Sequence, residues 1–376
     1  MQLWKRASGA LKDHGSLLRA SLTRRSSLSN PNIEIAVIKA TTHDESHVDY
    51  RSAQRVFAWV RISDEFLYRV LWVLFNRMNR NRNWVVALKG LMLLHGVFCC
   101  KVPGIQEIGQ LPYNLLNLKD KYVKHEKMSC LTTFIRAYFV FLGEKSGFIF
   151  FHSQEQRKRE VLSPDKTHEE QNENMIKQDF IWLQNLQYLL DKSLEIQPKS
   201  TTVNVLVLEA MDCIVVEIYD IYSRISNGIG TILMKTYSAG KQEAKMALSI
   251  LQKAKVQHEQ LSNFFEYCKD IGVCNASECP KMEQIPDEVI LELEHIISGD
   301  LSQSENKHYT KEEVKSIKVV EDSHTSIIGD KIHSSKTLNT EGWTVFEERK
   351  ILDLIDLSSS AEANTRFGPL PDLISF

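Results

Sequence analysis

The sequence lacks an apolar run long enough to cross a bilayer. Its longest candidate, Leu91–Cys100, contains His95 and is much shorter than the roughly 20 apolar residues that a membrane-spanning helix requires. No signal peptide is visible either, because Lys5 and Arg6 stand close to the first residue and no uninterrupted apolar run follows them. We therefore expect any contact with a membrane to be peripheral.

Proline and glycine are also scarce. The chain has 9 prolines and 16 glycines among 376 residues, and 43% of its residues are apolar. This composition argues against a mostly disordered chain and suffices for a substantial core. The seven cysteines are odd in number and lie mostly in apolar helical contexts. They predict a reduced, intracellular protein with buried thiols rather than a disulfide framework.

Catalytic motifs are missing as well. The sequence contains no G-x-S-x-G, G-x-x-x-x-G-K-[ST], H-E-x-x-H or G-x-G-x-x-G pattern that follows a strand. We therefore expect no enzyme, no catalytic residue, no cofactor and no metal site, and we interpret His95 as a satisfied core histidine. Four acids at helical spacing have no Glu-x-x-His partner motif, so we interpret them as a solvated face. These acids are Glu209, Asp212, Glu217 and Asp220.

What the sequence does contain is helical periodicity along most of its length. Trp84–Cys100 is apolar on nearly all sides, which predicts a buried central helix. Val203–Thr236 and Gly240–Val273 predict two long helices, and Pro286–Ile297 predicts the last ordered one. No segment shows convincing β alternation. The pattern therefore predicts an all-α fold, and periodicity alone does not distinguish among helical solenoids.

Charge is distributed unevenly along the chain. Residues 1–100 hold 15 Lys and Arg against 7 Asp and Glu, whereas residues 287–376 hold 9 against 18. Within residues 1–28, apolar residues recur at helical spacing among cations, with Asp13 as the single acid. This segment is typical of a basic amphipathic helix that lies on an anionic membrane, and the alternative is a helix that docks on the domain. The cations are Lys5, Arg6, Lys12, Arg19, Arg24 and Arg25.

A second candidate site follows the helix predicted at Ile33–Ala40. Asn30 and Pro31 suit its start, and Lys39 suits its negative C-terminal end. Hydroxyl and imidazole groups follow directly, among them His43 and His47. Such a group of donors at a helix end favours an anionic head group, and the alternative is an ordinary helix end followed by a turn.

Three segments follow one another along the chain: AVIKATTHDESHVDY, then Trp84-Val85-Val86 with Lys89 and His95, and then Phe134-Ile135-Arg136-Ala137-Tyr138. In this order they resemble the ANTH domain of clathrin assembly proteins of the plant type. The resemblance implies a right-handed, ENTH/VHS-like superhelix of antiparallel helices. It also implies a phosphoinositide site that uses Lys39, His43 and His47, although Asp44, Glu45 and Ser46 stand where the family has cations. Arg136 and Tyr138 predict an internal polar anchor.

We expect three parts in the chain. Residues 1–28 form the basic segment and residues 29–298 the ANTH-like domain, with a membrane-proximal part at about 29–160 and a long-helix part at about 167–298. Residues 299–376 have the composition of a disordered acidic tail. Short apolar islands in this tail resemble clathrin-binding motifs. They comprise Leu354, Ile355, Asp356 and Leu357, and Asp372, Leu373 and Ile374.

The resemblance implies a cytoplasmic, peripheral-membrane adaptor of coated pits and vesicles at the plasma membrane or the Golgi. Its implied partners are phosphoinositide-containing membrane, the clathrin heavy chain and, in some family members, vesicle SNAREs; nucleic acid is not among them. The first alternative is a cytosolic helical scaffold that has lost lipid binding. A weaker alternative is an RNA-binding solenoid. It is weaker because the sequence shows no interleaving of aromatic and basic residues.

Overall fold

The computed structural model describes residues 2–22, 31–111, 118, 124–162, 168–236, 240–277 and 286–298. Within these ranges the chain forms helices and no strand. Three short 3₁₀ helices, η1 (Pro103–Glu107), η2 (Ser200–Thr202) and η3 (Asn275–Ser277), lie between α-helices. The α-helices are α1 (Gln2–Leu22), α2 (Pro31–Ala40), α3 (Tyr50–Ile62), α4 (Asp64–Asn81), α5 (Trp84–Cys99), α6 (His125–Leu162), α7 (His168–Leu194), α8 (Val205–Thr236), α9 (Lys241–Asp270) and α10 (Asp287–Ser298).

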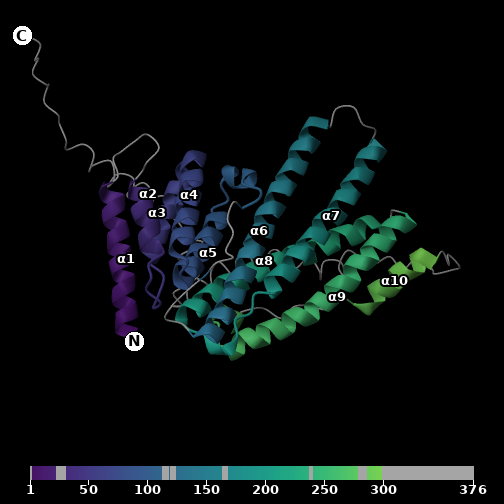
Figure 1. Ribbon diagram of the computed structural model, residues 1–376. Coiled ribbons are helices and arrows are strands. Elements are labelled where there is room, and N and C mark those ends of the chain that lie inside the picture. The colour runs from purple at the N-terminus through teal and green to yellow at the C-terminus, as the bar shows by residue number, and fades with distance from the viewer. Residues whose placement is uncertain are drawn as a thin grey trace, which may run out of the picture.

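Each helix contacts the next one along the chain, from α1 on α2 to α9 on α10. The shorter helices α1 to α5 stand side by side at one end of the molecule, and the longer helices α6 to α9 extend from them toward α10 (Figure 1). Sequential stacking of this kind buries a continuous core between neighbours. The predicted all-α superhelical class is therefore confirmed. The segment 299–376, which was expected to be a disordered tail, lies outside the described residues.

Helix α5 is the buried centre that its sequence predicts. Asn83 caps it, since its side-chain oxygen accepts hydrogen bonds from the backbone N–H groups of Val85 at 2.9 Å and Val86 at 3.4 Å. Every residue from Trp84 to Phe98 is buried. Because α3, α4, α6 and α8 all contact it, α5 has no face left for water.

The interpretation of the α8 acids as a solvated face is wrong for all but one of them. Asp212 is buried and accepts a hydrogen bond from the backbone N–H of Asn275 at 2.9 Å. Glu209 accepts one from the Tyr50 hydroxyl at 3.3 Å. Glu217 faces the inside, and of the four only Asp220 is exposed. Since α8 is packed against α5, α7 and α9, most of its circumference meets protein rather than solvent.

Glu217 belongs to a buried polar network that joins α5, α6 and α8. Lys145 Nζ lies 2.6 Å and His95 Nε2 lies 3.2 Å from Glu217 Oε2, and His95 Nδ1 lies 2.8 Å from the Tyr138 hydroxyl. Burial alone raises the pKa of Glu217, but the Lys145 charge and the His95 hydrogen bond outweigh it and lower that pKa. His95 is thus a satisfied core histidine, as predicted. Tyr138 is an internal polar anchor, as predicted. Arg136 is exposed, so the prediction of an internal anchor is wrong for this residue.

The cysteines are less buried than their sequence context indicates. Among the six whose positions the structure describes, only Cys268 is buried, while Cys99 and Cys274 are exposed. By whole-residue exposure the prediction of buried thiols is confirmed only for Cys268, although burial also raises the pKa of the thiols of Cys99, Cys100 and Cys213. Cys99 is the last residue of α5, where the packed centre of the helix gives way to the surface.

We predict that Glu217→Gln destabilises the folded chain by about 3 kcal/mol at pH 7, because it leaves the Lys145 ammonium buried without its counter-charge. Urea unfolding followed by circular dichroism measures this change. The matched control is Asp220→Asn on the same helix, whose side chain is 63% exposed. It should change the free energy of unfolding by less than about 0.5 kcal/mol. Equal effects of the two substitutions would contradict the buried network.

The pKa of Glu217 also predicts a pH dependence. This pKa is lowered from 4.5 in the folded protein, so its contribution to stability is complete above the unfolded pKa and is lost as the pH falls below it. The free-energy difference between wild type and Glu217→Gln should therefore shrink when unfolding is measured below about pH 4.5. A constant difference from pH 7 to pH 3 would disprove the assignment.

Candidate functional site

The candidate site begins where α2 ends. The backbone N–H of Thr41 bonds to the Val37 carbonyl at 3.1 Å, and the Thr41 hydroxyl donates to the same carbonyl at 2.6 Å. The chain then runs without helix to Tyr50. There Asp49 caps α3 by accepting the backbone N–H of Ser52 at 3.0 Å. The segment 41–49 is therefore fixed at both of its ends.

The side chain of Arg77, on α4, contacts the first residue of this segment. Its Nε donates to the Thr41 hydroxyl at 2.6 Å, and its Nη2 donates to the Thr41 carbonyl at 2.8 Å. The same Nη2 donates to Asp13 Oδ1 of α1 at 2.8 Å. One buried guanidinium thus joins α1, α4 and the end of α2.

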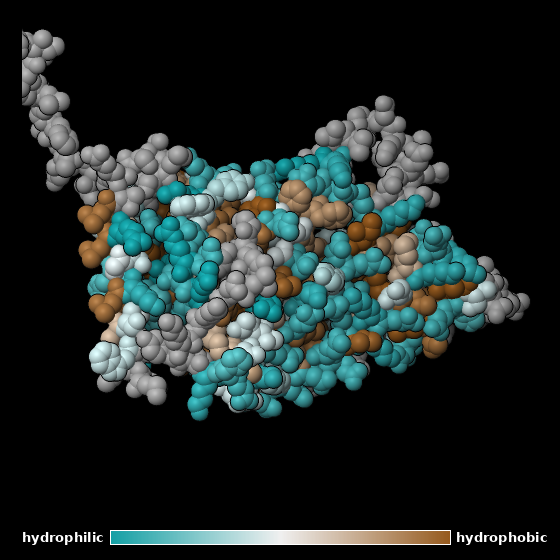
Figure 2. All heavy atoms as spheres, in the orientation of Figure 1, coloured by the Kyte–Doolittle hydropathy of each residue, from teal (hydrophilic) through white to brown (hydrophobic). Residues whose placement is uncertain are grey.

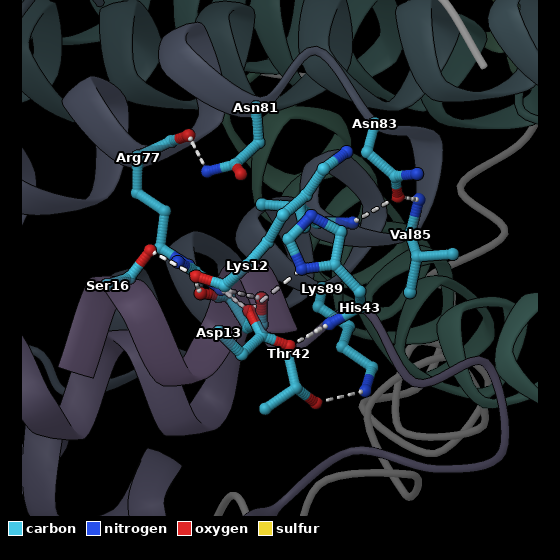
Figure 3. Close-up of polar contacts among 12 residues, drawn as sticks. Lys12, Asp13, Ser16, Thr42, His43, Arg77, Asn81, Asn83, Val85 and Lys89 are labelled. Carbon is cyan, nitrogen blue, oxygen red and sulfur yellow. Dashed lines mark hydrogen bonds and ion pairs between the residues drawn. The ribbon is translucent and has the colours of Figure 1, made fainter. Parts of the chain in front are cut away.

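Asp13 receives further hydrogen bonds from His43. Its Oδ2 accepts the backbone N–H of His43 at 2.8 Å, and its Oδ1 lies 2.8 Å from His43 Nδ1 (Figure 3). Because a carboxylate only accepts, Nδ1 is the ring nitrogen that carries the proton. Burial alone raises the pKa of Asp13, but the bonds from His43 and Arg77 prevail and lower it. Asp13 is therefore a buried anion held by three donor groups.

Lys89 of α5 approaches the same segment. Its Nζ donates to the Thr42 hydroxyl at 3.2 Å, and the residue is only 1% exposed. Burial lowers the pKa of Lys89 to about 8, although Asp44 and Glu209 act to raise it. Its charge therefore changes close to physiological pH, unlike that of an exposed lysine.

The sequence pattern of the ANTH domain matches residues 32–299. This chain belongs to the ANTH-domain family. It is 44% identical over 301 residues to "Putative clathrin assembly protein At1g25240" of Arabidopsis thaliana, covering 80% of this chain and 77% of the relative. "Putative clathrin assembly protein At1g68110" of the same plant is 38% identical over 351 residues, covering 93% and 88% of the two chains. The predicted family resemblance is thus confirmed.

In this ANTH domain the three predicted head-group residues are in different environments. Lys39 is exposed at the end of α2. The His47 side chain is 68% exposed and its Nδ1 lies 2.7 Å from the Ser46 hydroxyl. The His43 side chain, in contrast, is 6% exposed, because α1 lies over it. A Cβ added to Gly9 of α1 would stand 2.7 Å from His43 Cβ.

The N-terminal segment adopts the docked alternative, and its contact with a membrane stays a prediction. Helix α1 docks on α2 with its small and acidic residues, Gly9, Asp13 and Ala20, which are buried. Large apolar residues point outward along the edge of the ANTH domain, and Figure 2 shows this edge as brown patches. These residues are Trp4 (79% exposed), Leu11 (73%), Leu18 (63%) and Leu22 (81%).

The predicted cations of this segment are only partly described. Arg6, Lys12 and Arg19 are exposed on α1, whereas the Lys5 side chain, Arg24 and Arg25 lie outside the described residues. Both groups of predicted clathrin-binding residues, at 354–357 and 372–374, also lie outside them. Among the helices that the structure describes, none is long and apolar enough to span a bilayer.

Sequence reasoning missed the residues that hold the site of this ANTH domain together. Asp13 is the only acid of residues 1–28, and Arg77 stands alone between the buried Phe75 and Met78 of α4. A lone charge on an otherwise uniform face is a usable signal for a buried pair. Their partnership, however, joins positions far apart in the chain and has no signature in periodicity.

We predict that Lys89→Met removes a specific pH dependence of stability. Between the folded pKa of about 8 and the unfolded value of 10.5, the unfolded chain binds more protons at this side chain, so stability rises with pH. Relative to Lys89→Met, wild type should gain about 2–3 kcal/mol between pH 7 and pH 10 in urea unfolding experiments. The exposed Lys245→Met on α9 serves as control and should leave the pH profile of wild type unchanged. Parallel profiles of wild type and Lys89→Met would refute the burial effect.

Proposed function

We propose that this protein is a peripheral-membrane clathrin adaptor that binds phosphoinositides and clathrin and promotes clathrin coat assembly. Membership in the ANTH family and relatives named for clathrin assembly support this function. The structural observation that carries it is the exposed Lys39 at the end of α2, beside a segment fixed by buried ionic bonds. A cation on such a rigid segment is well placed to meet an anionic head group.

The head group would meet Lys39 and His47 first, since both are exposed. Two such contacts are weak, because a basic residue near an anionic membrane surface contributes about 1 kcal/mol. Asp44 and Glu45 beside them oppose an anion. A second source of membrane affinity is therefore needed in this proposal.

Helix α1 is suited to supply that second source. Its apolar residues Leu11 and Leu18 are exposed, and the cations Lys12 and Arg19 directly follow them in the sequence. A helix with apolar side chains flanked by cations lies in the interface of anionic membranes. Stable peripheral attachment generally takes two signals, and the head-group site and α1 would provide one each.

Clathrin recruitment is assigned to the acidic tail. The proposed contacts are the segment Leu354–Leu357, which resembles a clathrin box, and Asp372–Ile374. Short apolar islands between acids suit binding grooves on a folded partner. In this proposal the protein works on coated pits and vesicles of the plasma membrane or Golgi, and the long helices are available for vesicle SNAREs in a helix-in-groove mode.

The alternative function is a cytosolic interaction scaffold without lipid binding. Asp44, Glu45 and Ser46 favour it, since they replace expected cations, and so does the burial of His43 under α1. Vesicle binding decides between the two functions, because a scaffold would bind neither phosphoinositide nor other anionic vesicles.

We predict that Lys39→Glu weakens binding to vesicles containing phosphatidylinositol bisphosphate by at least about fivefold, since it removes one cation and adds an anion. Co-sedimentation of the full chain at physiological salt measures the affinity. Lys245→Glu, an equal charge reversal at an exposed position of α9, should retain wild-type affinity. Binding that is equally weak for both variants would indicate a response to net charge and not a head-group site.

We also predict that the double substitution Leu11→Ser and Leu18→Ser weakens binding to all anionic vesicles while leaving affinity for a soluble inositol phosphate unchanged. Both side chains are exposed, so the fold should not be affected. Each lost leucine removes about 1 kcal/mol or more of apolar burial in the membrane. If vesicle affinity stays at the wild-type value, α1 does not enter the membrane.

A further inference from the structure

Exposed apolar residues form a stripe along the outward side of α1. Its large members Trp4, Leu11 and Leu18 recur every seven residues, and the small, exposed Ala7 and Gly15 lie between them. A repeat of seven places residues along one side of a helix, as in contacts between two helices. An exposed apolar surface of this kind marks an interaction site. We call these residues and Leu22 the α1 stripe.

The charge beside the α1 stripe is positive. Lys12 and Arg19 are exposed, and each directly follows a leucine of the stripe. Asp13, the single acid of residues 1–28, is buried. Two copies of α1 that paired through their stripes would therefore bring cations together, and like charges across an interface are unfavourable. The stripe suits a partner whose apolar residues alternate with acids.

The acidic tail of the chain contains such a partner, which we call the acidic tail segment, residues 341–357. This segment holds five acids and two cations. Four of its large apolar residues recur at helical spacing, so a helix of this segment would present them on one side. These residues are Trp343, Phe346, Leu354 and Leu357.

The chain between the described domain and this segment is long enough to reach α1. Helix α10 lies at the far end of the molecule from α1 (Figure 1). Fully extended, residues 299–342 span up to about 145 Å. The longest dimension they must cross is set by helices such as α9, whose 30 residues extend over about 45 Å. Attachment to the same chain makes the contact intramolecular, so it needs little affinity of its own.

We infer that the acidic tail segment covers the α1 stripe in the absence of a membrane, and that an anionic membrane displaces it. This inference rests on the proposed function and adds its regulation. The segment would occupy the apolar residues and the cations Lys12 and Arg19 that are proposed to meet the membrane. It also contains Leu354–Leu357, which are proposed to meet clathrin. One contact would thus keep both surfaces from their partners until α1 reaches a membrane.

Photochemical crosslinking of the full chain tests the contact directly. Leu11→benzoylphenylalanine places a photoreactive apolar group in the α1 stripe, and Lys245→benzoylphenylalanine on α9 is the exposed control. Without lipid, we expect the crosslinks from position 11 to fall within residues 341–357 of the same chain, as located by mass spectrometry. Crosslinks to a second copy, to other segments only, or equally from position 245 would overturn the contact. Phosphatidylserine vesicles should lower the yield at least about threefold, and an unchanged yield would overturn the displacement.

A charge-neutral variant tests the effect on membrane binding. Leu354→Ser with Leu357→Ser removes apolar contacts of the segment but leaves net charge unchanged, so it should bind phosphatidylserine vesicles about fivefold more tightly than wild type. Ile327→Ser with Ile328→Ser makes the same chemical change elsewhere in the tail and should equal wild type. An equal rise for both variants would indicate a general effect of the tail and contradict the assigned segment.

The outcomes separate this inference from the proposed function. If wild type binds anionic vesicles but position 11 does not crosslink to residues 341–357, the inference fails while the proposed function stands. If these crosslinks form but neither wild type nor the Leu354→Ser, Leu357→Ser variant binds vesicles, the proposed function fails and the displacement fails with it. Crosslinks that vesicles suppress, together with tighter binding of this variant alone, would establish the regulation.

Discussion

The end of the molecule that α1 and α2 form depends on the buried Arg77 guanidinium. Two parts of the chain, the middle of α1 and the residue that follows α2, direct oxygen atoms at this one group: Asp13 Oδ1 and the hydroxyl and carbonyl oxygens of Thr41. Burying a cation costs free energy unless its N–H groups are hydrogen-bonded and its charge is paired. Removing any one of its partners therefore lowers the stability of the fold. Arg77 therefore fixes Thr41 directly, and Asp13, which it holds, fixes the backbone of His43.

A second ionic cluster has the same function deeper in the fold. Lys145, His95 and Glu217 connect helices of the first and second halves, while the residues around them are apolar. Apolar packing alone permits neighbouring helices to slide, because the hydrophobic effect is not directional. Fully satisfied polar contacts specify one arrangement. In a stack where helices contact mainly their neighbours, such fixed points determine how the two halves meet.

The sequence predicts the helices of this fold well and its polar contacts poorly. Trp84–Cys100 is apolar on every side, so its burial follows from composition alone. The acids of α8 could not be placed in this way, since their periodicity is the same whether solvent or another helix faces them. For Glu217 the deciding fact is Lys145 on α6, and for Asp13 it is Arg77 on α4. These pairs form between residues far apart in the chain, and a single sequence gives no signal for such contacts. Lys39 and His47, in contrast, were predicted from one local segment; both are exposed, and their role as head-group contacts stays a prediction.

Asp44, which stands where the resemblance led us to expect a cation, has a structural role in this segment. Asp44 accepts hydrogen bonds from the Ser46 backbone and hydroxyl at 3.1 and 2.6 Å, so the acid shapes the segment rather than projecting toward a ligand. The cations expected beside His47 are missing, while exposed Lys12 and Arg19 lie on α1, whose Asp13 is bonded to His43 and Arg77. Since α1 is held through Asp13, the position of Lys12 and Arg19 depends on the same contacts with His43 and Arg77 that fix this segment.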